Sequence, residues 1–189
     1  SGTNGVQSHT PTLWKLLQRY EVPVYIFVNK MDLTGADKLH VLNSIRSRLS
    51  NDIADFSDAE ELAENAAAGD EELMEEFLET DTLSDESISR AISQRRIFPC
   101  FFGSALKEQG ITEFLDALDK YTIAGEYSDE FGAKVYKISY DSKGSRLTHM
   151  KIMGGSLKVR SELEYLSNDG EKINEKISSL RFYSAEKFR

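Results

Sequence analysis

The chain has 189 residues, of which 40% are hydrophobic, and a formal net charge of −9. It is long enough for one or two domains with hydrophobic cores, and its composition is that of an ordinary soluble protein. No apolar run approaches the length of a membrane span and no signal-peptide pattern opens the chain, so we expect no membrane partner. Cys100 is the only cysteine. Its apolar surroundings predict a buried, inert thiol and a reducing, cytoplasmic setting.

The negative charge is confined to one segment of the chain. Between residues 52 and 86 there are 15 acidic residues and no lysine or arginine. The remaining residues carry 17 acidic and 23 basic side chains and are therefore mildly basic. This distribution permits contact with a large polyanion but does not demonstrate it.

A helix followed by a buried strand is predicted near the start of the chain. Thr10 fits an N-cap and Pro11 the first helical position. Residues 22–28 form an almost unbroken apolar run, which is typical of a parallel strand covered on both faces. In the helix that begins near Thr10, four apolar residues are expected to face inward, with Trp14 beside them: Leu13, Leu16, Leu17 and Tyr20.

Polar residues end this strand at the edge where open α/β sheets bind ligands. An Asn-Lys-x-Asp loop in this place suits guanine. Asp32 can accept hydrogen bonds from the N1–H and the amino group of the base as a charge-assisted fork, whereas adenine would leave the carboxylate unpaired. Lys30 can lay its aliphatic stem along the ring, and Asn29 can tie the loop to a neighbouring segment or to the base. A polar turn without a ligand is the alternative.

Several helices are predicted in and around the acidic segment. A helix over residues 37–49 is expected to face inward with Leu39, Leu42, Ile45 and Leu49. The acidic segment itself predicts two or three short helices docked on the main body. A disordered acidic tail is the alternative, which is disfavoured because Leu73, Met74, Phe77 and Leu78 require burial. A further helix over residues 84–96 would bury Ile88, Ala91 and Ile92.

A second apolar strand is predicted over residues 97–102. Because Pro99 cannot donate to a strand ladder, we expect this strand at the edge of the sheet. The strand leads into a turn of small residues, Gly103-Ser104-Ala105-Leu106, whose backbone N–H groups could reach a carbonyl such as guanine O6. The next helix is predicted over residues 111–121, with Ile111, Phe114, Leu115 and Leu118 on one side.

The pattern changes from helical to alternating at about residues 123–130. Strands are predicted over residues 131–140, 146–152, 156–163 and 173–180. Turns are predicted at residues 141–144, at Gly154-Gly155 and at Asn168-Asp169-Gly170. Short strands at regular spacing indicate a small barrel or sandwich.

The guanine-type loop, the Gly-Ser-Ala-Leu turn and the following strands together resemble the translational GTPases of the elongation factor G group. The resemblance extends over nearly the whole chain. Asn29-Lys30-Met31-Asp32 is similar to the fourth GTPase motif and Ser104-Ala105-Leu106 to the fifth. Residues 5–10 are similar to the segment after the fourth strand of the GTPase (G) domain, and residues 146–148 and 155–159 are the most specific part of the barrel.

This resemblance implies the α/β plus β class, with a partial P-loop GTPase domain and an incomplete small β-barrel. Residues 1–125 would be the C-terminal half of a G domain with a helical acidic insertion at about 51–96, and residues 126–189 the truncated barrel. It also implies GTP or GDP as ligand, Mg²⁺ in the full-length protein only, and the ribosome (rRNA and ribosomal proteins) as partner of the full-length protein. The implied guanine-binding residues are Asn29, Lys30, Asp32, Ser104, Ala105 and Leu106.

Within this group the chain is more similar to the tetracycline-resistance ribosomal protection branch than to elongation factor G proper. The factor has a proline-rich connector between the two domains, and residues 122–130 contain no proline. Residues 97–103 are also closer to the protection branch. An elongation factor G-like translocation factor is the alternative.

The departures from the group are as informative as the resemblance. The chain contains no G-x-x-x-x-G-K-[ST], so the phosphate cradle, its lysine and the hydroxyl for Mg²⁺ are absent. The catalytic histidine of the group is also absent, since His9, His40 and His149 match no motif position. Residues 141–144 fit D-x-x-G by letters alone and are expected to be a turn. We therefore expect a middle fragment, cut on both sides, without catalytic or metal-binding residues and without GTPase activity.

A function of another class is a non-catalytic module that docks a partner on the acidic helices. A P-loop upstream of Ser1 would distinguish the enzyme from this module. We also expect the fragment to self-associate through residues 22–28, because an apolar strand without lysine is a template for pairing when its neighbour is missing.

Overall fold

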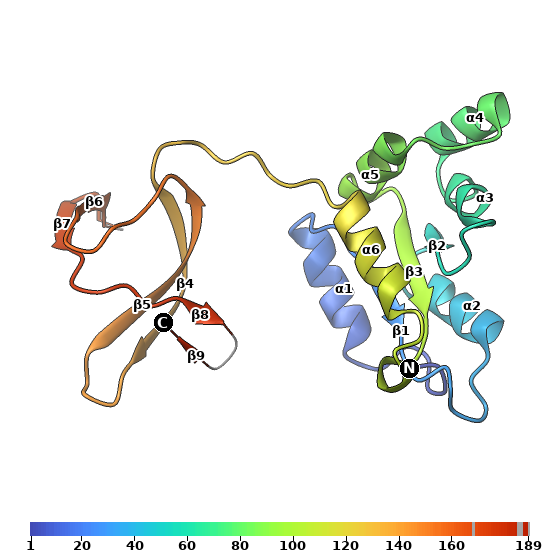
Figure 1. Ribbon diagram of the computed structural model, residues 1–189, viewed down its shortest axis with the longest axis horizontal. Helices are drawn as coiled ribbons and strands as arrows, with labels where there is room; N and C mark the ends of the chain where they lie inside the picture. The colour runs from blue at the N-terminus through green and yellow to red at the C-terminus, as the bar shows by residue number, and fades with distance from the viewer. Residues whose placement is uncertain (168, 185–186, 189) are drawn as a thin grey trace. The chain divides into compact units, whose positions relative to one another are not determined.

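The computed structural model describes residues 1–167, 169–184 and 187–188, which form two compact units, Ser1–Ala124 and Gly125–Arg189 (Figure 1). Each unit has its own architecture. The first is a mixed α/β unit built on parallel strands, and the second consists of antiparallel hairpins.

The first unit is organised around a three-stranded parallel sheet. The strand order is β1 (Ile26–Val28), β3 (Phe98–Phe102) and β2 (Ile53–Asp55). The predicted strands over residues 22–28 and 97–102 are confirmed, although β1 is shorter than the apolar run. The expected position of the second strand is wrong, because β3 lies in the middle of the sheet.

Pro99 is accommodated inside the sheet because its missing donor faces β1, whose ladder with β3 begins only one residue later. The Phe98 N–H donates to the Asp52 carbonyl at 3.0 Å, so Phe98 faces the β2 side. Backbone groups alternate between the two sides of a strand, so Pro99 faces the β1 side. The ladder between β1 and β3 begins only at the next residue, with the pair Ile26–Cys100. Proline therefore shortens β1 instead of placing β3 at the edge.

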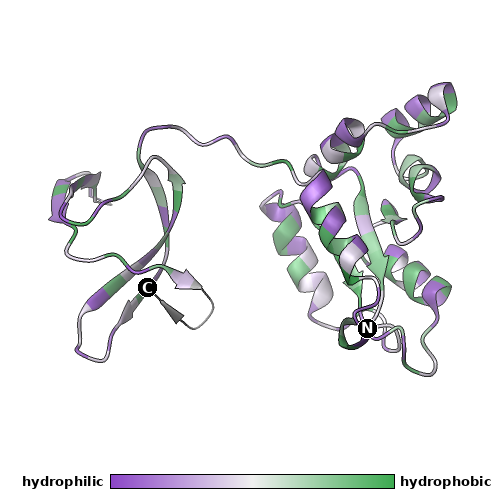
Figure 2. Ribbon diagram, viewed as in Figure 1, coloured by the Kyte–Doolittle hydropathy of each residue, from purple (hydrophilic) through white to green (hydrophobic). Residues whose placement is uncertain are grey.

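Helices cover both faces of this sheet. On one face, α1 (Thr10–Arg19) and α2 (Lys38–Arg48) pack against Phe98 and Cys100. On the other face, α3 (Leu62–Ala67), α4 (Glu71–Thr80), α5 (Asp85–Ser93) and α6 (Ile111–Tyr121) share a core with Phe101. Successive residues of β3 thus point to opposite cores, as the pleat of a strand requires. Figure 2 shows the strands of this unit as predominantly hydrophobic.

The inward face predicted for α1 is wrong for three of its four residues, and the fourth, Leu17, is half-buried. Leu13, Leu16 and Tyr20 are exposed, whereas Trp14 is buried and packs edge-on against Phe98 at 4.7 Å between ring centroids. The indole ring buries more area than any leucine and sets the rotation of the helix. The helix also begins at Thr10 itself, with His9 in the N-cap position.

Helices α2, α5 and α6 follow the predicted pattern with two exceptions. Asp37 caps α2 by accepting from the His40 N–H at 2.9 Å. Leu39 and Leu115 were expected to face inward but are exposed. The expected burial of five other residues is confirmed: Leu42, Ile45, Ile88, Ala91 and Ile92.

The acidic segment is folded, which excludes the disordered tail for these residues. Leu73 is completely buried, although Leu78, which was expected to be buried, is 77% exposed. The segment is not wholly helical, because it begins with β2, which completes the sheet at the edge beside β3. This strand was missed because it has only three residues and ends in an aspartate. Its identity depends on pairing with β3, about 45 residues away along the chain.

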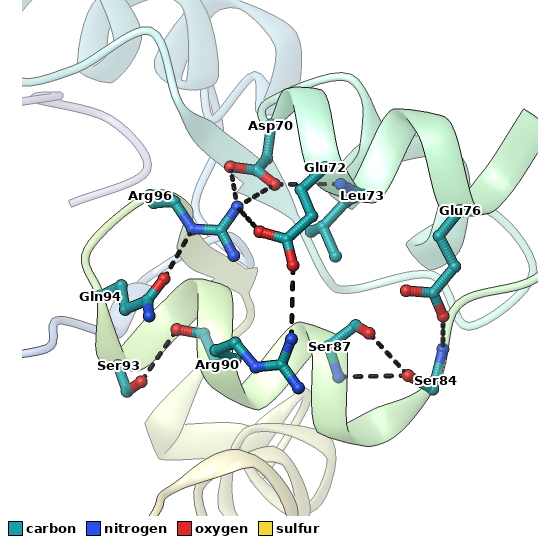
Figure 3. A network of polar contacts seen from close by, with 10 residues as sticks. All are labelled: Asp70, Glu72, Leu73, Glu76, Ser84, Ser87, Arg90, Ser93, Gln94 and Arg96. Carbon is teal, nitrogen blue, oxygen red and sulfur yellow. Dashed lines mark hydrogen bonds and ion pairs between the residues drawn. The ribbon is translucent and has the colours of Figure 1, made fainter.

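A network of ion pairs holds α4 against α5 and the segment that follows (Figure 3). Arg96 Nη1 lies 2.6 Å from Asp70 Oδ1 and 2.9 Å from Glu72 Oε2. Asp70 also caps α4 by accepting from the Leu73 N–H at 3.0 Å, and Arg90 approaches Glu72 at 3.3 Å. Two basic side chains C-terminal to the acidic segment thus neutralise part of its charge.

The second unit consists of three antiparallel pairs of strands. These are β4 (Gly132–Tyr140) with β5 (Arg146–Gly154), β6 (Glu162–Leu166) with β7 (Lys172–Lys176), and β8 (Tyr183–Ser184) with β9 (Lys187–Phe188). The first two predicted strands are confirmed. The predicted strand over 156–163 is wrong, because β6 begins only at Glu162, and β7 ends before residue 180.

The second unit shows the predicted turn after β4 and has no buried hydrophobic side chain among its described residues. The turn after β4 is confirmed, with Asp141 Oδ1 accepting from the Lys143 and Ser145 N–H groups. Of the predicted turn at residues 168–170, Asn168 lies outside the described residues. Every buried hydrophobic side chain in the described chain belongs to the first unit, so the described hairpins enclose no core of their own.

Candidate functional site

Two loops meet at the carboxyl ends of β1 and β3. The strands are parallel neighbours with Val28 opposite Phe102, so residues 29–32 and 103–107 emerge side by side. Two backbone hydrogen bonds join the loops: the Gly103 N–H donates to the Val28 carbonyl at 3.1 Å, and the Met31 N–H to the Gly103 carbonyl at 3.0 Å. The two motifs are thus held together at the edge where an α/β sheet binds ligands.

Asn29 is the side chain that links the two motifs. Its Oδ1 accepts from the Ala105 N–H at 2.9 Å and from the Lys30 N–H at 2.7 Å. The backbone carbonyl of Asn29 accepts from the Gly2 N–H at 2.7 Å. Of the two roles left open for Asn29, the structure shows the tie to the neighbouring segment. A guanine carbonyl that approached Ala105 would share this N–H with Asn29.

The Gly103–Ser104 turn is closed by tight backbone contacts. Ser104 is buried, its N–H donates to the Gln109 carbonyl at 3.0 Å, and its carbonyl accepts from the Gln109 N–H at 3.0 Å. A Cβ on Gly103 would lie 2.1 Å from the Gln109 carbonyl oxygen, so only glycine fits there. Ala105 and Leu106 follow in the short 3-10 helix η1 (Ala105–Lys107), where Leu106 is almost fully exposed.

Asp32 presents an ionised carboxylate at this edge. The Ser104 hydroxyl foremost, then the backbone N–H of Asp32 itself and the nearby Lys107 ammonium, hold the pKa of the Asp32 carboxyl below its ordinary value. Lys107 Nζ lies 3.6 Å from Asp32 Oδ2. An ionised carboxylate accepts hydrogen bonds only, so this group suits a ligand edge that carries neighbouring N–H donors.

Lys30, which lies between Asn29 and Asp32, has a backbone conformation that is unusual for a residue other than glycine. Its φ of 67° lies in the left-handed region, where a residue other than glycine is strained. Its side chain is exposed, as is needed for an aliphatic stem that covers a bound ring. Sequence reasoning did not identify Lys107. It follows the predicted turn directly, but its approach to Asp32 depends on the pairing of β1 with β3.

Other chemically reactive groups lie apart from this edge. Cys100 is fully buried, as predicted, and burial raises the pKa of its thiol to about 12. His149 lies in the second unit, where Nε2 is 2.7 Å from Ser139 Oγ. Within the described ranges, no cluster of three or more His, Cys, Asp or Glu side chains could hold a metal ion. No described helix has the length and hydropathy needed to cross a bilayer.

Comparison with known proteins gives concordant matches. Residues 1–124 match the family described as Elongation factor Tu GTP binding domain. Tetracycline resistance protein TetW of Butyrivibrio fibrisolvens is 28% identical over 93% of this chain and 30% of its own length. Tetracycline resistance protein TetS of Listeria monocytogenes is 24% identical over 95% of this chain and 31% of its own. The chain thus spans about a third of the length of these relatives.

A solved structure shares the fold of the chain. The crystal structure of a protein from Thermus thermophilus superposes with a TM-score of 0.74 at 18% identity. The superposition covers 99% of this chain and 35% of the other. At this level of identity the likeness concerns the fold alone.

Proposed function

Because the chain belongs to the elongation factor Tu GTP-binding domain family, we propose that it is part of a ribosome-associated translational GTPase. The first unit would be the C-terminal half of a G domain with the acidic helices as its insertion. The second unit would be part of the barrel domain that follows. GTP or GDP would be the ligand, and the ribosome the partner of the full-length protein. Any Mg²⁺ would be held outside the described residues.

One observation carries this proposal. The Asn29 side chain accepts from the Ala105 N–H and so joins the two loops that would enclose a base. In that site Asp32 would accept from the N1–H and the amino group of guanine. Lys30 and Leu106, both exposed at the rim, would cover the faces of the ring. The hydroxyl of buried Ser104 would donate a hydrogen bond to the Asp32 carboxylate.

The relatives support the ribosomal protection branch over an elongation factor. Both curated relatives are named as tetracycline resistance proteins and match across both units. The connector over residues 122–130 lacks the prolines of the elongation factors. We therefore place the full-length protein in the protection branch, with a translocation factor as the alternative.

Titration with nucleoside monophosphates tests the base site directly. GMP is expected to shift the backbone amide NMR signals of Lys30, Asp32 and Leu106, because these residues surround the proposed base. AMP is the control, since its edge presents an acceptor to the Asp32 carboxylate. Equal responses to GMP and AMP would contradict a guanine site.

This chain is expected to bind GDP with roughly millimolar affinity or weaker. The base contacts are present, but the sequence has no phosphate cradle, and in this class phosphate and Mg²⁺ contacts anchor the nucleotide. Isothermal calorimetry measures the affinity. Micromolar binding of GDP would show that the described loops hold the nucleotide without a P-loop.

The chain is also expected to self-associate through β1. This strand lies at the edge of the sheet, and the apolar run over residues 22–28 contains no lysine that would hinder pairing with a second copy. The exposed apolar residues Leu13, Leu16 and Tyr20 of the neighbouring helix α1 would add buried area. Light scattering at about 100 µM, a concentration that favours weak pairing, measures the association.

Two outcomes decide this prediction. A dimer whose Phe27 amide is protected from hydrogen exchange only at high concentration would support pairing of β1 edges. A monomer with slow exchange throughout residues 22–28 would show that the chain covers its own edge, and the prediction would fail.

A docking module without catalysis is the second candidate. It is favoured by α4, on which Leu78 is exposed beside Glu71, Glu75 and Glu79. An apolar side chain framed by carboxylates suits a basic partner. A P-loop in the sequence upstream of Ser1 would favour the GTPase, and its absence would favour the docking module.

A further inference from the structure

The ion pair between Lys107 and Asp32 connects the two loops of the base site. Lys107 Nζ lies 3.6 Å from Asp32 Oδ2, and the Asp32 side chain is only 13% exposed. Lys107 is fixed at its backbone, because its N–H donates to the Ser104 carbonyl at 3.1 Å. The carboxylate thus comes from the loop after β1, and its cation from the loop after β3.

The remaining capacity of the carboxylate matches the edge of guanine. Two carboxylate oxygens offer about four lone-pair positions. The Ser104 hydroxyl engages one of them and the backbone N–H of Asp32 itself engages another, while Lys107, 3.6 Å from Oδ2, occupies none. Two positions are then left for the N1–H and the amino group of the base. At 3.6 Å the ammonium lies beyond normal hydrogen-bond length and acts mainly through its charge.

We propose that Lys107 is a positioning residue, which holds the Asp32 carboxylate in the orientation that presents its free lone pairs to guanine. This inference rests on the proposed function, since it assigns a role within the same site. Lys107 acts through Asp32 and need not touch the base. The lowered pKa of Asp32 agrees with this role, because base reading requires the ionised carboxylate.

A surface ion pair without this role would behave differently on removal. Removing such a pair would change neither the affinity for the base nor the pH dependence of that affinity. Lys120 provides such a pair for comparison. Its Nζ lies 2.7 Å from Asp85 Oδ1, and its side chain is 51% exposed against 56% for Lys107.

The test compares Lys107→Met with Lys120→Met in the whole chain. GMP and AMP are titrated by NMR, and the Asp32 carboxyl is titrated with pH in the absence of nucleotide. Lys107→Met is expected to weaken GMP binding at pH 7.5 by roughly two- to fivefold, the effect that an exposed ion pair supplies. It should also raise the pKa of Asp32, so that GMP binding is lost at a higher pH on acidification. Lys107→Arg should restore both, and Lys120→Met should change neither.

The outcomes separate this inference from the proposed function. If the unsubstituted chain prefers GMP over AMP and Lys107→Met leaves GMP affinity unchanged or higher, the positioning role is overturned while the guanine site stands. If the unsubstituted chain responds equally to GMP and AMP, the guanine site fails and the inference fails with it.

Discussion

Asp32→Asn is expected to change the base preference of the full-length protein from guanine to xanthine by ~10²-fold or more. The substitution replaces two acceptor oxygens with one acceptor and one donor. The donor then meets the amino group of guanine, and both donors are left unpaired. Xanthine carries a carbonyl at that position and restores a matched pair. The Asp32 side chain is only 13% exposed, so water cannot easily compensate.

Competition between GTP and XTP measures this effect in protein that contains the phosphate-binding half. Asp116→Asn, on the exposed face of α6, is a control that changes charge by the same amount away from the loops. An unchanged preference for GTP in Asp32→Asn would mean that another residue reads the base.

Gly103→Ala is expected to lower the free energy of unfolding by about 2–4 kcal/mol and to abolish base binding. The added Cβ would lie 2.1 Å from the Gln109 carbonyl oxygen and 3.0 Å from the Phe27 ring. No side-chain rotation relieves a collision with a backbone atom, so the turn must move. That movement breaks the hydrogen bonds of Gly103 to Val28 and Met31, which join the two loops.

Urea unfolding followed by tryptophan fluorescence measures the loss, because Trp14 is the only tryptophan and lies in the core of the first unit. Gly132→Ala is the matched control, since a Cβ there would meet no atom within 4 Å. If Gly103→Ala unfolded at the same urea concentration as the unsubstituted chain, the loop would relax without cost. The tight closure of the turn would then contribute nothing to the free energy of unfolding.

Local features of the sequence determined much of the first unit. The apolar runs predicted β1 and β3, and the polar residues after each strand predicted where the loops lie. Asp37 and the periodicity of Leu42 and Ile45 predicted α2, since a cap and a helical stripe depend only on residues a few positions apart. The motif residues Asn29 and Asp32 were also readable, because their chemistry depends on side-chain type and on position after a strand.

Tertiary structure alone decided the features that depend on distant pairs. The middle position of β3 follows from β2, a three-residue strand that is stable only through pairing and burial. The rotation of α1 follows from the fit of Trp14 against Phe98, which no periodicity reveals. The approach of Lys107 to Asp32 requires two loops that are about 75 residues apart to emerge beside one another. Sequence patterns fix what a segment can form, whereas long-range contacts fix which partner it meets, because those contacts exist only after the chain has folded.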